Sequence, residues 1–103
     1  MLTGKCKKDF RKWLNDNHRY AINYFDNLHP SLKFGFYQDF FYDSELYIHF
    51  VILVTRSYQA TISNKKNEIV SSTVIDSDKS KVIIEIIQQA NSLYNANIKN
   101  KAY

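Results

Sequence analysis

The longest apolar run of the chain covers residues 46–54, and it predicts a central β-strand. Most of its residues are β-branched or aromatic, the types that pack well on a pleated surface. The even positions are all apolar, whereas Tyr47 and His49 place polar tips on the odd side. At the two-residue period of a strand, we therefore expect a dry even face covered by helices and a partly covered odd face. The run is too short to cross a bilayer.

The region before Pro30 carries apolar residues at intervals of three and four, the spacing of one helical face. It predicts one helix from Lys7, or two helices broken near residues 15–17. A second face of this helix carries polar and mostly basic residues. They are Lys8, Arg11, Lys12, Asn15 and Arg19.

Residues 31–42 fit two patterns. Leu32, Phe36, Phe40 and Phe41 have helical spacing, and Phe34, Phe36, Phe40 and Tyr42 fit a strand. Pro30 ends the preceding helix and is well suited to the first position of a new one. We favour a helix, although Gly35 then costs about 1 kcal/mol relative to alanine.

The second half predicts two further strands and a helix. Residues 56–64 and 68–75 alternate as strands, with the polar segment 64–67 as a hairpin loop. Residues 76–78 offer N-cap oxygens to a helix that ends near Asn97. Its apolar stripe consists of Val82, Ile83, Ile86, Ile87, Ala90, Leu93 and Tyr94.

These elements predict an α+β fold with N-terminal helical segments, a three-stranded antiparallel meander and a C-terminal helix packed on the sheet. We expect one compact domain over residues 1–103, with frayed ends at about 1–5 and 98–103. The outer strands are rich in hydroxyl and amide side chains, which predicts a wet sheet face or an open edge where a partner strand adds.

Composition points to a binding protein. Aromatic residues make up 16% of the chain, with 8 Tyr and 7 Phe, so some are expected on the surface as contact anchors. The lone Cys6 cannot form an intramolecular disulfide, and no leader segment is recognisable, which predicts a reducing, cytoplasmic setting.

The net charge of +4 is concentrated toward the two ends of the sequence. Such clusters are either solvated faces or surfaces that contact nucleic acid or an acidic protein. The candidate partner- or RNA-binding residues are Lys7, Lys8, Arg11, Lys12, Arg19, Lys65, Lys66, Lys79 and Lys81.

No motif predicts catalysis. His18, His29 and His49 lack further ligands at metal-binding spacing, and two glycines cannot build a phosphate-cradling loop. Neighbouring lysines would lower the pKa of the Cys6 thiol, but one cysteine is not a catalytic set. We expect a protein that is not an enzyme, with no cofactor, no metal and no small-molecule substrate.

Three stretches resemble small phage and prophage proteins: LTGKCKKDFRKWL at 2–14, HPSLKFGFYQDFF at 29–41 and ANSLYN at 90–95. The chain departs from them where Glu45-Leu46 replaces a Val-Gly pair. The resemblance implies an inhibitor of a host defence system, specifically an anti-CRISPR protein that acts on a type VI RNA-guided ribonuclease. The implied partner is that nuclease or its guide RNA, in the cytoplasm of a bacterial host, with the inhibitor a monomer or homodimer and no membrane involved.

A small basic RNA- or DNA-binding protein is the alternative. The order helix, three strands, helix is similar to that of a double-stranded-RNA-binding domain, in which Lys79 and Lys81 would contact phosphate. The chain departs from that pattern because it lacks the glycine-bearing strand loop and inserts residues 31–42. Asp76 and Asp78 would also repel phosphate.

Overall fold

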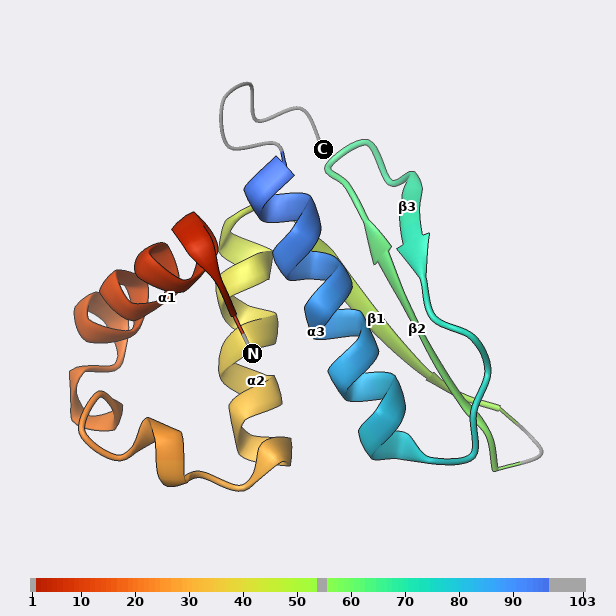
Figure 1. Cartoon of the computed structure of the whole chain (residues 1–103). Helices are drawn as coiled ribbons and strands as arrows, with labels where there is room; N and C mark the ends of the chain where they lie inside the picture. Colours follow the sequence, from red (N-terminus) through yellow and green to blue (C-terminus); the bar gives the residue numbers. More distant parts are fainter. Residues whose placement is uncertain (1, 54–55, 97–103) are drawn as a thin grey trace.

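The computed structural model describes residues 2–53 and 56–96, in which helices cover one face of a small sheet (Figure 1). Helix α2 packs on β1 and α3 packs on β2, whereas α1 packs on the two helices. This arrangement confirms the predicted α+β fold. The elements in chain order are α1 (Gly4–Asn17), the 3₁₀ turns η1 (Arg19–Ala21) and η2 (Phe25–Asn27), α2 (Pro30–Asp43), β1 (Tyr47–Ile52), β2 (Tyr58–Ser63), β3 (Ile69–Ser72) and α3 (Lys79–Ala96).

The sheet is the predicted antiparallel meander, in the order β1-β2-β3. Ile48 lies opposite Ile62, and Thr61 lies opposite Ser72, with a register shift at Ile62/Ser63. The predicted hairpin loop is closed by Asn64, whose Oδ1 accepts hydrogen bonds from the backbone of residues 66 and 68. Asn67 adopts a φ of 64°, a conformation that asparagine tolerates better than most residues.

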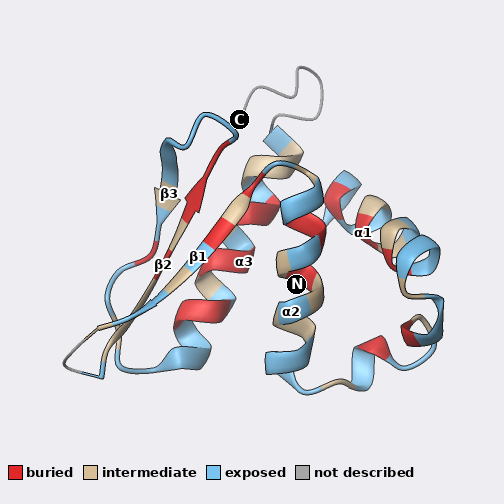
Figure 2. Cartoon of the chain, turned by 180° about the vertical axis from the view of Figure 1, so that it is seen from behind, coloured by how far each residue is buried: buried red, intermediate tan, exposed pale blue. Residues whose placement is uncertain are grey.

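The helices lie on the even face of β1, as the alternation predicts (Figure 2). Leu46 and Ile48 are buried there, and Phe50 is half-buried against Phe34 of α2. The prediction is wrong at Ile52, which is 68% exposed. The reason is that β1 extends beyond the helices that cover it. Position 54 lies outside the described residues.

The ambiguous segment 31–42 is helical within α2. Pro30 occupies its first turn, and Nδ1 of His29 accepts a hydrogen bond from the Ser31 backbone N–H. Tyr37, Phe40 and Phe41 are its buried residues. No atom of another element lies within 4 Å of where a Gly35 side chain would begin, so packing does not require glycine there.

The N-terminal region breaks where the sequence predicts, because α1 ends at Asn17. The second helix allowed by the pattern is replaced by η1 and η2. Arg19 therefore lies outside α1 and does not continue its polar stripe. Trp13 ties α1 to the end of α2 through a 2.7 Å hydrogen bond from its indole N–H to Asp43.

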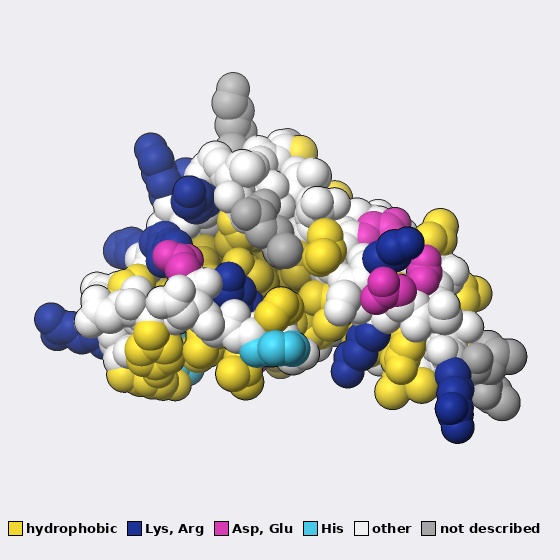
Figure 3. All heavy atoms as spheres, turned by 60° about the horizontal axis from the view of Figure 1, so that its bottom comes forward, with side chains coloured by type: hydrophobic (Ala, Val, Ile, Leu, Met, Phe, Trp, Pro, Cys, Tyr) yellow, Lys and Arg dark blue, Asp and Glu magenta, His cyan; other side chains and the backbone are white. Residues whose placement is uncertain are grey.

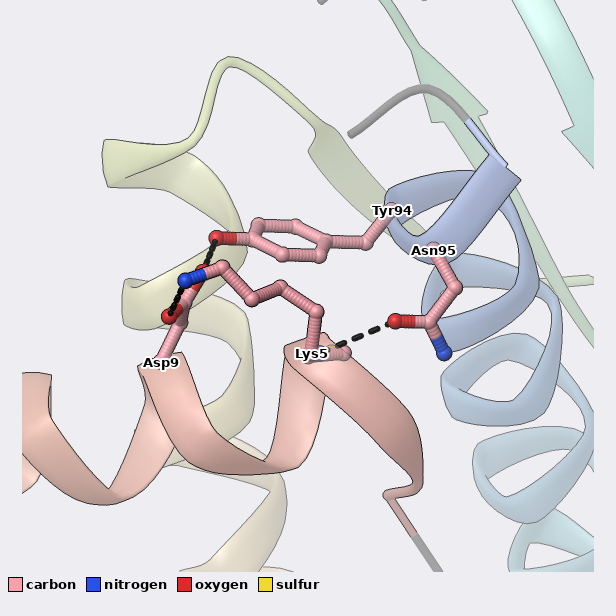
Figure 4. A network of polar contacts seen from close by, with 5 residues as sticks. Lys5, Asp9, Tyr94 and Asn95 are labelled. Atoms are coloured by element: carbon pink, nitrogen blue, oxygen red, sulfur yellow. Dashed lines mark hydrogen bonds and ion pairs between the residues drawn. The ribbon is translucent and has the colours of Figure 1, made fainter. Parts of the chain in front are cut away.

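The start of the chain differs from the frayed segment that we expected. Leu2 is only 7% exposed, and the backbone N–H of Thr3 donates to Asn91 of α3 at 3.0 Å. Asn95 accepts from the Cys6 backbone N–H, and the Tyr94 hydroxyl donates to Asp9 (Figure 4). These contacts hold residues 2–9 against the end of α3. The segment 98–103, also predicted to fray, lies outside the described residues.

Helix α3 is capped by Asp78, whose Oδ1 accepts hydrogen bonds from the backbone of residues 80 and 81. The predicted apolar stripe faces the core, with Leu93 and Tyr94 half-buried. Asn91, which the pattern did not place there, is also buried. Among the described residues, no helix has both the length and the apolar character needed to span a membrane.

Candidate binding surfaces

The nine basic residues singled out in the sequence lie on four separate parts of the fold. Lys7, Lys8, Arg11 and Lys12 belong to α1, and Arg19 belongs to η1. Tyr58 pairs with Asp76 at the end of β2 nearest the start of α3, and the hairpin leaves the other end of β2. Lys79 and Lys81 thus lie at the opposite end of the sheet from Lys65 and Lys66. On the face shown in Figure 3, Lys and Arg side chains form separate groups.

Several of these cations already have intramolecular contacts. Arg11 forms a 2.7 Å ion pair with Asp26, and Lys65 lies 3.6 Å from Glu45. The Lys79 ammonium lies 5.7 Å from the centre of the Phe50 ring. Lys8 and Lys12 are exposed on the outer side of α1 and have no ion pair with a described residue.

The face of the sheet opposite the helices forms a second candidate surface, which we call the outer sheet face. The pairing register and the strand alternation assign nine residues to it. They are Tyr47, His49, Val51, Gln59, Thr61, Ser63, Ile69, Ser72 and Val74. Val51 is 40% exposed, Ile69 69% and Val74 67%, so the face presents aliphatic side chains to solvent.

Polar and aromatic contacts fix the rest of the outer sheet face. Nε2 of His49 lies 3.0 Å from the Ser63 hydroxyl, and Tyr47 stacks edge-on against Tyr42 of α2. None of the nine residues is a lysine or an arginine. The middle row of this face, His49, Thr61 and Ser72, is polar, and the exposed aliphatic residues lie toward its two ends, without fixed positive charge.

One edge of this sheet is partly covered. The side chain of Gln38 in α2 donates to the backbone carbonyl of Ile48 at the edge of β1 that does not face β2. This contact blocks a partner strand at that position. The exposed Ile52 lies further along the same strand.

Cys6 corrects an expectation from the sequence. Its three lysine neighbours suggested a lowered thiol pKa, but the side chain is fully buried on the inner side of α1. Burial, followed by the Asp9 carboxylate, raises the pKa of this thiol to about 12. The lysines lie on other sides of the helix, so sequence proximity is not spatial proximity here.

His18 and His29 also have identifiable structural roles, in ring packing and in helix capping. The His18 ring lies against Trp13 and Phe36, and His29 caps α2. In residues 2–53 and 56–96, no group of three His, Cys, Asp or Glu side chains is placed to hold a metal ion.

Sequence reasoning missed the aliphatic residues of the outer sheet face, because Ile69 and Val74 lie in stretches dominated by serine and threonine. It also missed Lys33, which the fold brings near Lys7 and Arg11 in a cleft between α1 and α2. Only the tertiary contact of the two helices reveals that grouping.

Comparison with known proteins gave no match to a family model and no significant match to a curated protein or to a solved structure.

Proposed function

We propose that this protein inhibits a host defence nuclease by binding it through the outer sheet face. The observation that carries the proposal is the exposure of Val51, Ile69 and Val74 on one uncovered side of the sheet. Exposed aliphatic side chains on an uncovered face gain free energy when a protein surface buries them. Val51 and Ile69 lie on regular strands, which keep them in a fixed geometry, so little ordering entropy is lost there on binding.

The chemistry of this face favours a protein partner over a nucleic acid. Affinity for nucleic acid depends largely on cations that neutralise phosphates, and the nine outer residues contain no lysine or arginine. The core of a protein interface is instead poor in charge and rich in apolar and aromatic residues. Tyr42, 65% exposed, lies against Tyr47 and extends the surface with an aromatic contact.

The resemblance of residues 2–14, 29–41 and 90–95 to phage proteins supports the identity of the partner. We propose an RNA-guided ribonuclease of a type VI defence system, bound as the nuclease or as its guide-RNA complex. Binding by this face involves no covalent chemistry in the inhibitor.

The test measures target-activated RNA cleavage by purified type VI nuclease loaded with guide RNA, with increasing amounts of this protein. The variant Ile69→Lys/Val74→Lys places two charges on the outer sheet face and is expected to abolish inhibition. The matched control is Leu32→Lys, because Leu32 is also an exposed aliphatic residue, at 58%, but belongs to α2. It is expected to inhibit like the unmodified protein.

A pull-down with the tagged protein from defence-competent lysate, with and without ribonuclease treatment, separates the two parts of the proposal. If the nuclease is not inhibited but another protein is captured only with an intact outer face, the partner is wrong and the surface is right. If inhibition survives Ile69→Lys/Val74→Lys, the surface is wrong. Capture of the nuclease only while RNA is intact would place the guide in the interface.

A second candidate function is RNA or DNA binding, which is favoured by Lys8 and Lys12, exposed on α1 and without an ion pair to any described residue. Such binding should weaken steeply with salt, with a slope set by the number of phosphates contacted. Charge reversal at Lys8 and Lys12 should then remove it, while the outer-face variant leaves it unchanged. Affinity that does not respond to salt would exclude this candidate.

A further inference from the structure

A small cleft of about 210 Å³ lies where α1, η2 and α2 meet. Lys7 and Arg11 line it from α1, Asp26 from η2, and Lys33 and Tyr37 from α2. The aromatic rings of Phe10 and Phe25 form part of its wall. Residues that are 26 positions apart in the sequence, Lys7 and Lys33, thus face the same space.

The cleft has an excess of positive charge. Asp26 is its single carboxylate, and that group pairs with Arg11 at 2.7 Å. Neither Lys7 nor Lys33 has a carboxylate partner among the described residues. The Lys33 ammonium lies 5.7 Å from the centre of the Phe25 ring, and the Arg11 guanidinium lies 5.8 Å from the same centre. Two positive charges therefore remain uncompensated around this space.

Tyr37 adds a neutral hydrogen-bond donor. The residue is only 8% exposed, and it lines the cleft. Within residues 2–53 and 56–96, no group hydrogen-bonds to its hydroxyl. Burial raises the pKa of this phenol above its usual value, so it stays protonated and can donate at neutral pH. No buried side-chain nitrogen or oxygen of the described residues lacks a hydrogen-bond partner, so the Tyr37 hydroxyl oxygen is itself reached by solvent and is open to a ligand in the cleft.

We propose that this cleft binds the phosphate group of a phosphate monoester, with Lys7, Arg11, Lys33 and Tyr37 as its donors. A phosphate monoester carries a charge of about −1.5 to −2 at neutral pH, which matches the two uncompensated positive charges. Its oxygens accept several hydrogen bonds at once, which suits donors that come from two helices. The cleft is smaller than the roughly 300 to 1,000 Å³ of sites that enclose whole ligands, so it holds the phosphate end of a larger molecule.

This site is distinct from the outer sheet face, and its test does not depend on the proposed inhibition. The same chemistry has two sources, a free mononucleotide and the terminal phosphate of an oligonucleotide. The experiment titrates the full chain with inorganic phosphate, with AMP, and with one short RNA in its 5′-phosphorylated and 5′-hydroxyl forms. Binding is followed by calorimetry and by backbone amide shifts of the cleft residues.

Two variants and one matched control test the residues. Lys7→Gln should weaken AMP binding about tenfold, the effect of losing one charge-assisted contact. Tyr37→Phe, which keeps the buried ring, should weaken it several-fold. Lys8→Gln changes the net charge of α1 equally but does not line the cleft, and it should change the AMP affinity less than about twofold.

Equal affinity for AMP and for the phosphorylated RNA would assign the site to free monoesters. Tighter binding of the phosphorylated RNA than of AMP or the 5′-hydroxyl RNA would assign it to nucleic-acid ends. The proposal is overturned if no phosphate probe binds saturably, if Lys8→Gln weakens AMP binding as much as Lys7→Gln, or if AMP does not bind and the two RNA forms bind equally. Should Tyr37→Phe fail to fold, Lys7→Gln decides, because Lys7 is an exposed side chain.

Discussion

Thr3 and Asn91 are joined by two hydrogen bonds, although 88 positions separate them in the chain. The Asn91 side-chain oxygen accepts from the Thr3 backbone N–H, and its amide donates to the Thr3 hydroxyl, both at 3.0 Å. Asn91 is only 8% exposed. This pair fixes the start of α1 against α3, a role that hydrophobic periodicity does not reveal.

The first prediction follows from this pair. Replacing Asn91 with alanine leaves the Thr3 N–H without its acceptor in a part-buried place, and it should lower the free energy of unfolding by about 2 kcal/mol. Urea denaturation measures this change. The neighbouring Ser92 is exposed on the same helix, so Ser92→Ala should shift stability by less than about 0.5 kcal/mol. If Asn91→Ala and Ser92→Ala lowered the free energy of unfolding equally, the Thr3–Asn91 hydrogen bonds would contribute nothing to stability.

The second prediction concerns the cap of α3. Asp78 accepts from the Ser80 backbone N–H at 3.0 Å, and its charge lies at the positive end of the helix. Asp78→Ala should cost about 1 kcal/mol of stability. Ser77→Ala provides the control, since no hydrogen bond to α3 comes from Ser77 among the described contacts. Thermal unfolding of both variants checks it, and an unchanged midpoint for Asp78→Ala would refute the cap.

The sequence predicts the fold because its strongest signals are local. Alternation in 46–54, the proline at 30 and the asparagine-lysine loop at 64–67 each specify one element. The same logic fails at Ile52, where the pattern shows an apolar position but not how far the helices extend. It fails also at the start of the chain, where Leu2 is buried and the exposed Thr3 hydrogen-bonds to Asn91 and Asn95 of a distant helix.

The candidate surfaces were harder to predict for a related reason. A basic cluster in the sequence reveals the charge of its side chains but not which way they point. Arg11 was therefore grouped with Lys8 and Lys12, although its guanidinium forms an ion pair with Asp26. The cleft needs Lys33 from another helix, and the outer sheet face needs the register that places Ile69 beside Ser63. Both depend on tertiary geometry.

The third prediction is a loss of stability at alkaline pH that comes from Cys6. The folded-state pKa of this thiol is raised to about 12 from an ordinary value of 9.0, so folding favours the neutral thiol. Its contribution is complete below pH 9 and is lost as pH rises toward 12. Unfolding free energies measured from pH 8 to 10.5 should therefore fall more for the unmodified protein than for Cys6→Ala.

The comparison with Cys6→Ala isolates the thiol, because both proteins keep Tyr37, whose pKa is also raised by burial. At pH 8, iodoacetamide should modify Cys6 only after addition of denaturant, because the side chain is fully buried. Rapid alkylation of the folded protein, or parallel pH profiles for the two proteins, would contradict the burial of Cys6.

The fourth prediction compares the two faces of β1. Ile48 points into the core at 6% exposure, whereas Val51 lies on the outer sheet face at 40%. Threonine keeps the β-branched shape at both positions, so strand propensity changes little. Ile48→Thr buries a hydroxyl and removes apolar contact, which should cost about 2 to 4 kcal/mol in urea unfolding. Val51→Thr should cost less than about 0.5 kcal/mol.

A large cost at Val51 would mean that the outer sheet face is already covered in solution. The unfolding midpoint would then rise with protein concentration, because a second copy would have to dissociate as the chain unfolds. A small cost, with a midpoint independent of concentration, means that Val51, Ile69 and Val74 contribute little to folding. Their aliphatic character would then have no role in the stability of the isolated chain, which is the condition expected of residues that serve a partner.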